Sequence, residues 1–286
     1  MNIEWHGQSA FTLRGSERSV LIDPFDQRLR PEGMSIRFDY PQIPQQQVDL
    51  LLITHEHFDH NGAAIADGSP HLVRSTAGSF EATPVGEVIA IASEHDDQAG
   101  TRRGPNTIFV FAVDGVRICH MGDFGQAALR PEQREAIGTV DLLFVPVGGG
   151  PTIDAAAAAE ITRALDPRWV VPMHYRTDRI DFLEPADAFL ATFDDVHTPA
   201  AGEFDLSGVP AGEEPQVVQL GVAAVRRRAR RGYTQGREAL PRPDLRLPDE
   251  RARFRADQGP AGVAGNGRSA GSGRSRRAGV QHLHDP

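Results

Sequence analysis

Short apolar runs separated by glycine make up the start of the chain. Residues 2–5, 9–13 and 19–22 are apolar or alternate between apolar and polar, with Gly7 and Gly15 between them. Runs of this length with turn residues between them predict short strands. We therefore expect an opening antiparallel meander that ends at residue 22.

The next stretch changes character. Residues 26–47 are rich in proline, glutamine and arginine and show no period, which predicts an irregular loop able to reach over a site. Residues 48–53 are a continuous apolar run, which is typical of a strand buried in a layered fold.

Beyond residue 60, apolar runs alternate with segments of helical pattern. Asp114-Gly115 between two apolar runs is the strongest hairpin signal in the chain. Pro131 and Gly138 bracket one short helix, as helix ends prefer, and Thr152 or Asp154 caps another that is rich in alanine. We expect strands at 72–75, 88–92, 107–113, 116–121, 141–147 and 169–173, and helices at 61–66, 131–137, 154–165 and 184–192.

The order of these elements predicts a mixed α/β (α+β) fold. The patterns before and after about residue 105 resemble two similar β-rich halves with helices outside. The composition, 40% hydrophobic and 24% charged residues, is that of an ordinary globular protein. The expected organisation is one domain at residues 1–220, followed by a tail at 221–286.

The predicted tail differs in charge from the domain. Past residue 220 there are about fifteen arginines against about six acids, although the whole chain has a formal charge of −9. Arginine, glycine and proline with few apolar anchors predict a disordered extension. Its basic charge could contact nucleic acid, but it lacks interleaved aromatic residues for base stacking, so we do not expect nucleic-acid binding.

Targeting signals are not evident in the sequence. No stretch approaches the apolar length of a membrane span, and the first residues lack a basic and then apolar signal pattern. The single cysteine, Cys119, lies in an apolar run, which predicts a small buried side chain in a reducing compartment. The expected localisation is cytoplasmic, without membrane contact.

The densest chemistry follows the apolar run 48–53. Residues 54–61 read Thr-His-Glu-His-Phe-Asp-His-Asn. His55 and His57 are two apart, so on an extended segment they project to one side and can bind one cation. Asp59 and His60 diverge from them and suit a second cation nearby, as in two-metal hydrolytic sites.

Three more candidate ligands follow apolar strands. His95 follows the run 88–92 and would complete three imidazoles on the first metal, although a loop histidine in a polar turn is the alternative. Asp123 has two carboxylate oxygens and can bridge two cations. His174 is the candidate last ligand of the second metal. His120, three residues before Asp123, is expected to contact the ligands rather than the metal.

These motifs resemble a known family. The run His-x-His-x-Asp-His after an apolar strand resembles the signature of the metallo-β-lactamase superfamily of metal-dependent hydrolases. Ser-Glu-His-Asp at 93–96, His-Met-Gly-Asp at 120–123 and Gly-Gly-Gly followed by Pro-Met-His-Tyr within 141–175 resemble its ascorbate-6-phosphate lactonase-like branch. The resemblance covers about residues 1–220 and implies an αββα four-layer sandwich with two metals at one edge.

The resemblance has two departures. The Gly-His-Thr segment of glyoxalase II-like members is absent from the sequence, which disfavours thioester and β-lactam chemistry. The inserted domain of the nuclease branch is not evident either. A phosphodiesterase or nuclease with the same metals, and a metal or ligand sensor without turnover, remain as alternatives.

The expected activity is hydrolysis by a hydroxide that bridges two divalent ions, with Asp59 also steering the proton of the water. Zn²⁺ and Mn²⁺ both suit a site without cysteine ligands. Gly149 and Gly150 precede a helix and could bind an anion through their N–H groups, and Arg102 and Arg103 add positive charge. The alternative is that the glycines serve tight packing and the arginines are solvated. We therefore expect a small anionic substrate, an ester or lactone that is phosphorylated, and a homo-oligomer is compatible with this interpretation.

Overall fold

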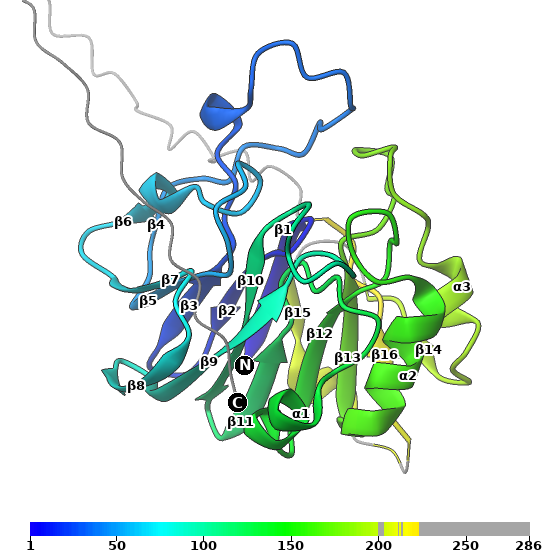
Figure 1. Ribbon diagram of the computed structural model, residues 1–286. Helices are drawn as coiled ribbons and strands as arrows, with labels where there is room; N and C mark the ends of the chain where they lie inside the picture. Colours follow the sequence, from blue (N-terminus) through cyan, green and yellow to red (C-terminus); the bar gives the residue numbers. More distant parts are fainter. Residues whose placement is uncertain (200–202, 211, 213, 223–286) are drawn as a thin grey trace, which may run out of the picture. The chain divides into compact units, whose positions relative to one another are not determined.

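The computed structural model describes residues 1–199, 203–210, 212 and 214–222. The predicted tail lies outside the described residues, apart from its first two positions. Two β-sheets carry the described chain, with strand order β15-β1-β2-β3-β5-β7 in a six-stranded sheet and β14-β16-β13-β12-β11-β10-β9-β8 in an eight-stranded sheet (Figure 1).

The six-stranded sheet contains the predicted meander. Antiparallel pairing joins its first three strands, and parallel pairing joins β3, β5 and β7. Its strands are β1 (Asn2–Gly7), β2 (Ala10–Arg14), β3 (Ser19–Ile22), β5 (Leu50–Ile53), β7 (His71–Arg74) and β15 (Glu203–Asp205).

The eight-stranded sheet contains the predicted hairpin. Asp114 and Gly115 both have positive φ (50° and 77°), so the turn twists as the flanking strands require. β11 pairs in parallel with β12, and the strands that follow β12 in the sheet order, β13, β16 and β14, also pair in parallel. The strands are β8 (Gly78–Thr83), β9 (Gly86–Glu94), β10 (Pro105–Val113), β11 (Val116–His120), β12 (Leu142–Pro146), β13 (Trp169–Met173), β14 (Val196–His197) and β16 (Gln216–Val218).

Burial on both faces explains the continuous apolar run of β5. Leu50 and Leu52 face the other sheet in the main core, whereas Leu51 and Ile53 face a second, smaller core on the outer side. Successive strand residues point to opposite faces, so a strand covered on both sides must be apolar throughout.

Helices cover one outer face. α1 (Pro131–Ile137) packs against β9, α2 (Ala155–Leu165) packs against β12, and α3 (Asp187–Leu190) packs against α2 (Figure 1). No helix in the described ranges is long and apolar enough to cross a bilayer.

The outer face of the six-stranded sheet is covered differently. Phe25, Phe38, Tyr40 and Ile43 of the segment after β3, with Ile65, pack on Leu21 and its neighbours. This layer consists of irregular chain, the 3₁₀ turns η1 (Gln27–Leu29) and η2 (Ala63–Ile65), and the two-stranded sheet of β4 (Gln46–Gln47) and β6 (Ala66–Asp67). The mixed α/β fold is confirmed, with 3₁₀ turns where a second α-helical layer was expected.

Several predicted details were wrong. The helix expected at 61–66 is the 3₁₀ turn η2, and the helix expected at 184–192 shortens to the single turn α3. The boundary between the sheets lies near residue 75 rather than 105, because β8 and β9 belong to the eight-stranded sheet. The sequence also gave no signal for β8, β14, β15 and β16, which are short or lie at a sheet edge.

Candidate metal centre

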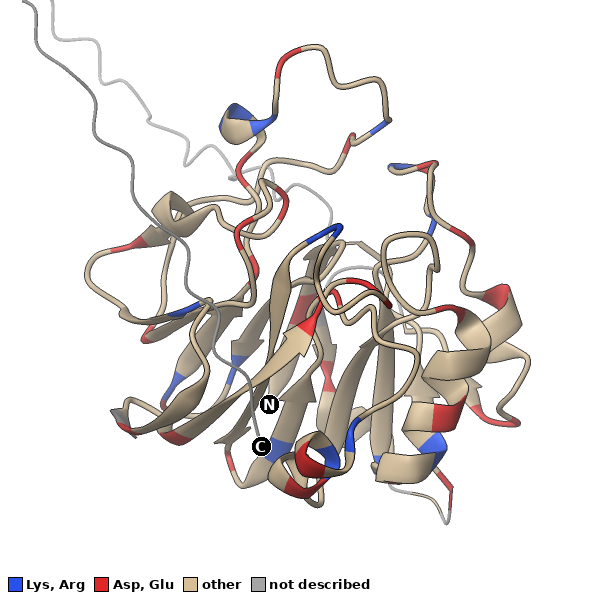
Figure 2. Ribbon diagram, in the orientation of Figure 1, with Lys and Arg blue, Asp and Glu red and all other residues tan. Residues whose placement is uncertain are grey.

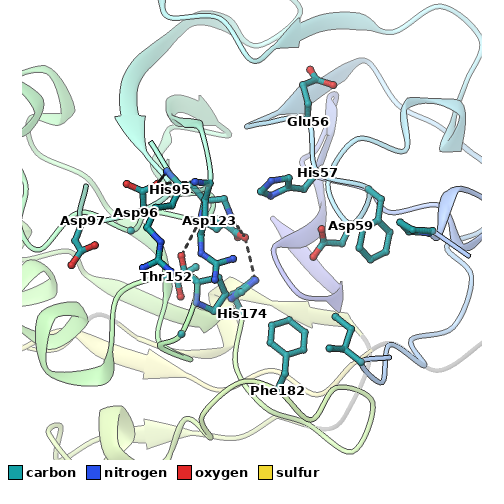
Figure 3. Close-up of a pocket in the computed structure, with 18 residues that line it drawn as sticks. Glu56, His57, Asp59, His95, Asp96, Asp97, Asp123, Thr152, His174 and Phe182 are labelled. Atoms are coloured by element: carbon teal, nitrogen blue, oxygen red, sulfur yellow. Dashed lines mark hydrogen bonds and ion pairs between the residues drawn. The ribbon is translucent and has the colours of Figure 1, made fainter. Parts of the chain in front are cut away.

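The candidate ligands come from the ends of four strands. The segment after β5 carries His55, His57, Asp59 and His60, and His95 follows β9 directly. Asp123 lies just beyond β11 and His174 just beyond β13. All seven predicted ligands meet at this edge: their donor atoms form three overlapping groups within 4.8 Å, His55–His57–His95, His55–His60–Asp123 and Asp59–His60–His174. Figure 3 shows those that line the cavity, His57, Asp59, His95, Asp123 and His174.

One carboxylate oxygen joins these groups. Asp123 Oδ2 lies 3.2 Å from the Nε2 atoms of His60, His95 and His174, and 4.0 Å from Nε2 of His55. Its other oxygen, Oδ1, accepts a hydrogen bond from Ser9 Oγ at 3.0 Å. Asp123 therefore has the central position predicted for a bridging ligand.

In three histidines, a hydrogen bond at Nδ1 fixes the orientation of the ring. His60 Nδ1 donates to Asp23 Oδ2 at 3.0 Å, and His95 Nδ1 donates to the Pro151 carbonyl at 3.0 Å. Thr54 donates its hydroxyl to Asp23, so its oxygen accepts from His55 Nδ1 at 3.0 Å. In His60 and His95, Nε2 is then the atom with the free lone pair, and it faces inward, whereas Nε2 of His55 lies 3.0 Å from Nδ1 of His57.

This arrangement fits a bound cation. The lone pairs on Nε2 of His60 and His95 face the Asp123 carboxylate at 3.2 Å, and the carboxylate is also an acceptor, so these atoms repel unless a proton or a cation lies between them. Nε2 of His60 is buried and has no hydrogen-bond partner. Imidazole nitrogens and carboxylate oxygens at these separations form a donor set suited to Zn²⁺ or Mn²⁺.

The pKa shifts of two of the imidazoles agree with a bound cation. Burial lowers the pKa of His55 well below 6.5, and His60 lowers it further, so the ring stays neutral as a metal ligand must be. Burial opposes the charged form of His60 as well, but Asp123, Asp59 and Asp23 outweigh it and hold the pKa of His60 well above 6.5. The carboxylates around His60 thus supply the negative potential that a cation needs.

Residues that the sequence interpretation did not assign support the ligands. Asp23 accepts from the backbone N–H and the hydroxyl of Thr54, both at 2.7 Å, as well as from His60. Gln8 donates to Asp59 Oδ2 at 3.2 Å, and Asn106 accepts from the backbone N–H of Asp123 at 3.0 Å. Asp23 directly follows an apolar strand, the same signal that identified Asp123.

Three of the seven non-glycine residues with positive φ in the described ranges lie at the same place. Gln8, Asp23 and His174 have φ of 50°, 45° and 51°, in the left-handed region that most residues other than glycine avoid. Such conformations persist only where the surroundings hold them, and they cluster at functional sites.

His120 takes the position predicted for it. Gly122 N–H donates to its Nδ1 at 3.2 Å, and its Nε2 donates to the Ser9 carbonyl at 3.0 Å. His120 therefore contacts the residues that flank Asp123 and is not one of the clustered metal donors.

The cluster opens into a cavity of about 950 Å³. Arg102, Arg103 and Gly150 line this cavity together with His57, Asp59 and His174. The loop before β10 carries basic residues at the sheet edge where acidic residues also gather (Figure 2). The structure thus brings both predicted arginines and one of the two predicted glycines to the site.

Gly149 is an exception. It does not line the cavity, and its N–H donates to the Ile153 carbonyl at 3.1 Å, so the N–H is not free for an anion. The neighbouring Gly148 serves packing, because a Cβ there would collide with the His174 carbonyl oxygen. The predicted anion site retains Gly150, Arg102 and Arg103.

Two β-sheets with an edge cluster of histidines and aspartates define a candidate metal-binding protein, and comparisons with known proteins identify its class. A family model described as a beta-lactamase superfamily domain matches residues 2–174. A UPF0173 metal-dependent hydrolase of Thermococcus onnurineus is 31% identical over 199 residues, covering 62% of this chain and 85% of the relative. A UPF0173 protein of Pyrococcus abyssi is 30% identical over 200 residues, covering 62% and 84%.

Solved structures agree. A metallo-beta-lactamase superfamily protein of Thermotoga maritima, described as a candidate Zn-dependent hydrolase, aligns with a TM-score of 0.61 at 29% identity, covering 77% of this chain and 98% of that one. An isothiocyanate hydrolase from Delia radicum gut bacteria shares the fold alone. It aligns with a TM-score of 0.53 at 16% identity, covering 67% of this chain and 91% of that one. The chain belongs to the metallo-β-lactamase superfamily.

Proposed function

We propose that the chain hydrolyses a small anionic ester or lactone with two divalent cations, Zn²⁺ or Mn²⁺. His55, His57 and His95 would hold one cation, and Asp59, His60 and His174 would hold the other. Asp123 would bind both cations. Bound cations supply a coordinated water with a pKa lowered towards ~7 and polarise the scissile oxygen.

Residues of the chain orient the metal donors and accept the proton of the water. Asp123 is fixed by Ser9 and Asn106, and three of the histidines, His55, His60 and His95, are fixed by their Nδ1 partners, so most of the donor set is preorganised. Asp59 is the more exposed of the two clustered carboxylates and lines the cavity, so it can accept the proton of the attacking water.

The charge of the cavity supports an anionic substrate. Five carboxylates line it, but Asp59 and Asp123 belong to the cluster, and Arg74 neutralises Glu56 through a bond of 2.8 Å. Asp96 accepts four backbone N–H groups, from Gln98, Gly100, Arg102 and Arg103.

Neutral N–H groups stabilise the charge of Asp96 without cancelling it, so Asp96 and Asp97 are the carboxylates that share the cavity with two guanidinium groups. Neither Arg102 nor Arg103 forms an ion pair with any residue in the described part of the chain. These two cavity-lining arginines are the observation that carries the proposal, because a guanidinium can bind a phosphate or carboxylate bidentately. Resemblance to the ascorbate-6-phosphate lactonase-like branch favours a phosphorylated lactone.

We also propose a compartment, and the cysteine supports it. Cys119, the single cysteine of the sequence, is fully buried in β11, and burial raises the pKa of its thiol to about 12. An unpaired, unreactive thiol is compatible with a reducing compartment, and we place the enzyme in the cytoplasm.

Phosphorylated and unphosphorylated forms of one lactone test the substrate class. The metal-loaded enzyme should show a kcat/KM about tenfold or more higher for the phosphorylated form, since a charge-assisted hydrogen bond contributes ~1.5–3 kcal/mol. Arg103→Ala should reduce this ratio about tenfold, whereas Arg134→Ala, exposed on α1, should leave it unchanged. Equal kcat/KM for the two forms, or a ratio that Arg103→Ala does not change, would contradict the anionic substrate.

A further inference from the structure

One part of the cavity is apolar. Ile36, Phe58 and Phe182 line it, and they come from three segments: the loop after β3, the metal-binding segment after β5, and the loop after β13. We call these three side chains the apolar wall. Phe182 and Asp97 lie at separate ends of the cavity, on either side of His174 (Figure 3).

The apolar wall is held in place by the layer behind it. The ring of Phe58 packs edge to face on Phe38, with centroids 5.4 Å apart, and Phe38 is 2% exposed. Phe38 forms a β-bridge with Ile180, two residues before Phe182, and Asp39 N–H donates to the Arg179 carbonyl at 2.9 Å. The two loops therefore form one scaffold, which presents the wall without a large ordering cost on binding.

The apolar wall exposes apolar surface in the same cavity as the metal ligands and the two arginines. Phe182 is 39% exposed, although Ile180, two residues before it, and Leu183, which follows it, are fully buried. Ile36 and Phe58 are half-buried. Exposed apolar side chains that converge with polar groups in one cavity are the usual composition of a small-molecule site.

We infer that the apolar wall binds an alkyl or aryl group of the substrate, so that the substrate is an amphiphilic ester or lactone. Its reacting carbonyl would lie at the metal cluster, its anionic group towards Arg102 and Arg103, and its apolar group on Phe182 and its neighbours. This inference rests on the proposed hydrolase function and specifies the substrate class of the same site.

A series of alkylphosphonates, from methyl to octyl, tests the wall through binding rather than turnover. The phosphonate group is constant along the series, so the change in Kd with chain length isolates the alkyl contacts. Calorimetry on the full metal-loaded chain should show affinity rising about twofold to fourfold per methylene until the wall is covered, as expected for removing a methylene from water.

Two variants make the test specific. Phe182→Ala should reduce the gain per methylene to about half or less, and because Phe182 is partly exposed the variant should still fold. Leu29→Ala is the matched control, since Leu29 is 51% exposed and does not line the cavity. An affinity that does not rise with chain length in the unmodified enzyme, or an equal rise in the enzyme and Phe182→Ala, would overturn the inference.

The hydrolase function is tested separately. Hydrolysis of 4-nitrophenyl esters by the same preparations reports on turnover, whereas the phosphonates report only on binding. A chain-length dependence of Kd without any ester hydrolysis would support the apolar wall and contradict the proposed hydrolysis alone.

Discussion

At the residue scale, the most informative feature is how few side chains fix the metal donors. Asp23 receives three hydrogen bonds, two from Thr54 and one from His60, and through Thr54 it also sets the ring of His55. A carboxylate behind a ligating imidazole fixes its tautomer and raises its basicity.

Replacing Asp23 should therefore weaken metal binding without removing a ligand. In the unmodified chain, both carboxylate oxygens of Asp23 accept hydrogen bonds. The amide of Asp23→Asn has only one acceptor oxygen, so His60 loses its fixed orientation. We expect metal affinity to fall about 10–100-fold, measured by competition with a chromophoric chelator. Asp49→Asn is the control, because Asp49 accepts comparable bonds from Ser19 at the other end of β3. Equal metal affinity in the two variants would show that Asp23 has only a structural role.

A second residue-scale prediction concerns pH and stability. Burial, with a smaller contribution from Arg14, lowers the pKa of His6 from 6.5 to about 4, and its Nε2 pairs with Thr12 Oγ1 at 2.7 Å. The folded state therefore prefers neutral His6 while the unfolded chain protonates near pH 6.5. The contribution to stability is present above pH 6.5 and is lost as the pH falls towards 4, by ~3 kcal/mol in all.

His6→Gln removes this titration. In metal-free protein, the difference in unfolding free energy between the unmodified chain and His6→Gln should shrink by ~2–3 kcal/mol between pH 7 and pH 4. Denaturant titrations at several pH values measure it. A difference that stays constant over this range would mean that His6 is not held neutral in the fold.

Residue identities were predictable where a strand delivered them. The seven predicted ligands lie together because each follows an apolar run, and the same rule would have found Asp23 had its position after β3 been interpreted as functional. Gln8, Ser9 and Asn106 carry no such signal, because their roles arise from contacts between distant segments. Ser9, for example, meets Asp123 across 114 positions of sequence.

At the element scale, local chemistry predicted those helices whose ends carry a proline, a glycine or a side-chain cap. The helix α1 begins at Pro131 and ends before Gly138, as expected, and Asp154 caps α2 by accepting from Ala157 N–H at 2.9 Å. The segment 61–66 lacks a side-chain cap, and its backbone forms one 3₁₀ turn instead of a helix. Edge strands such as β15 depend on pairing with a distant partner, which the periodicity of three residues cannot show.

The cap of α2 gives a prediction at this scale. Asp154→Ala should lower the unfolding free energy by ~1 kcal/mol, the usual effect of removing an N-cap acceptor, and should leave metal content unchanged. Glu160→Ala, at an exposed position of the same helix, should have little effect. Equal losses of stability in the two variants, measured by denaturant unfolding, would argue that the cap contributes nothing.

At the scale of the whole molecule, the site exists because two sheets end at one edge. The six-stranded sheet supplies Asp23 and the segment from His55 to His60, and the eight-stranded sheet supplies His95, Asp123 and His174. Apolar patterns predicted the strands that carry the ligands, although they placed the boundary between the two halves near residue 105 rather than 75. The extent of the cavity was not predictable, since it depends on how the loops after β3 and β13 bridge at Phe38 and Ile180.

The central claim is that this edge holds two divalent cations for hydrolysis, and metal content tests it most directly. Elemental analysis of protein stripped with chelator, reloaded with Zn²⁺ or Mn²⁺ and freed of excess should give about two ions per chain, since two of the three donor groups, His55–His57–His95 and Asp59–His60–His174, share no residue. His174→Ala should retain about one ion and lose hydrolysis. A stoichiometry near one that persists at saturation, with no loss of metal in His174→Ala, would contradict the two-metal site.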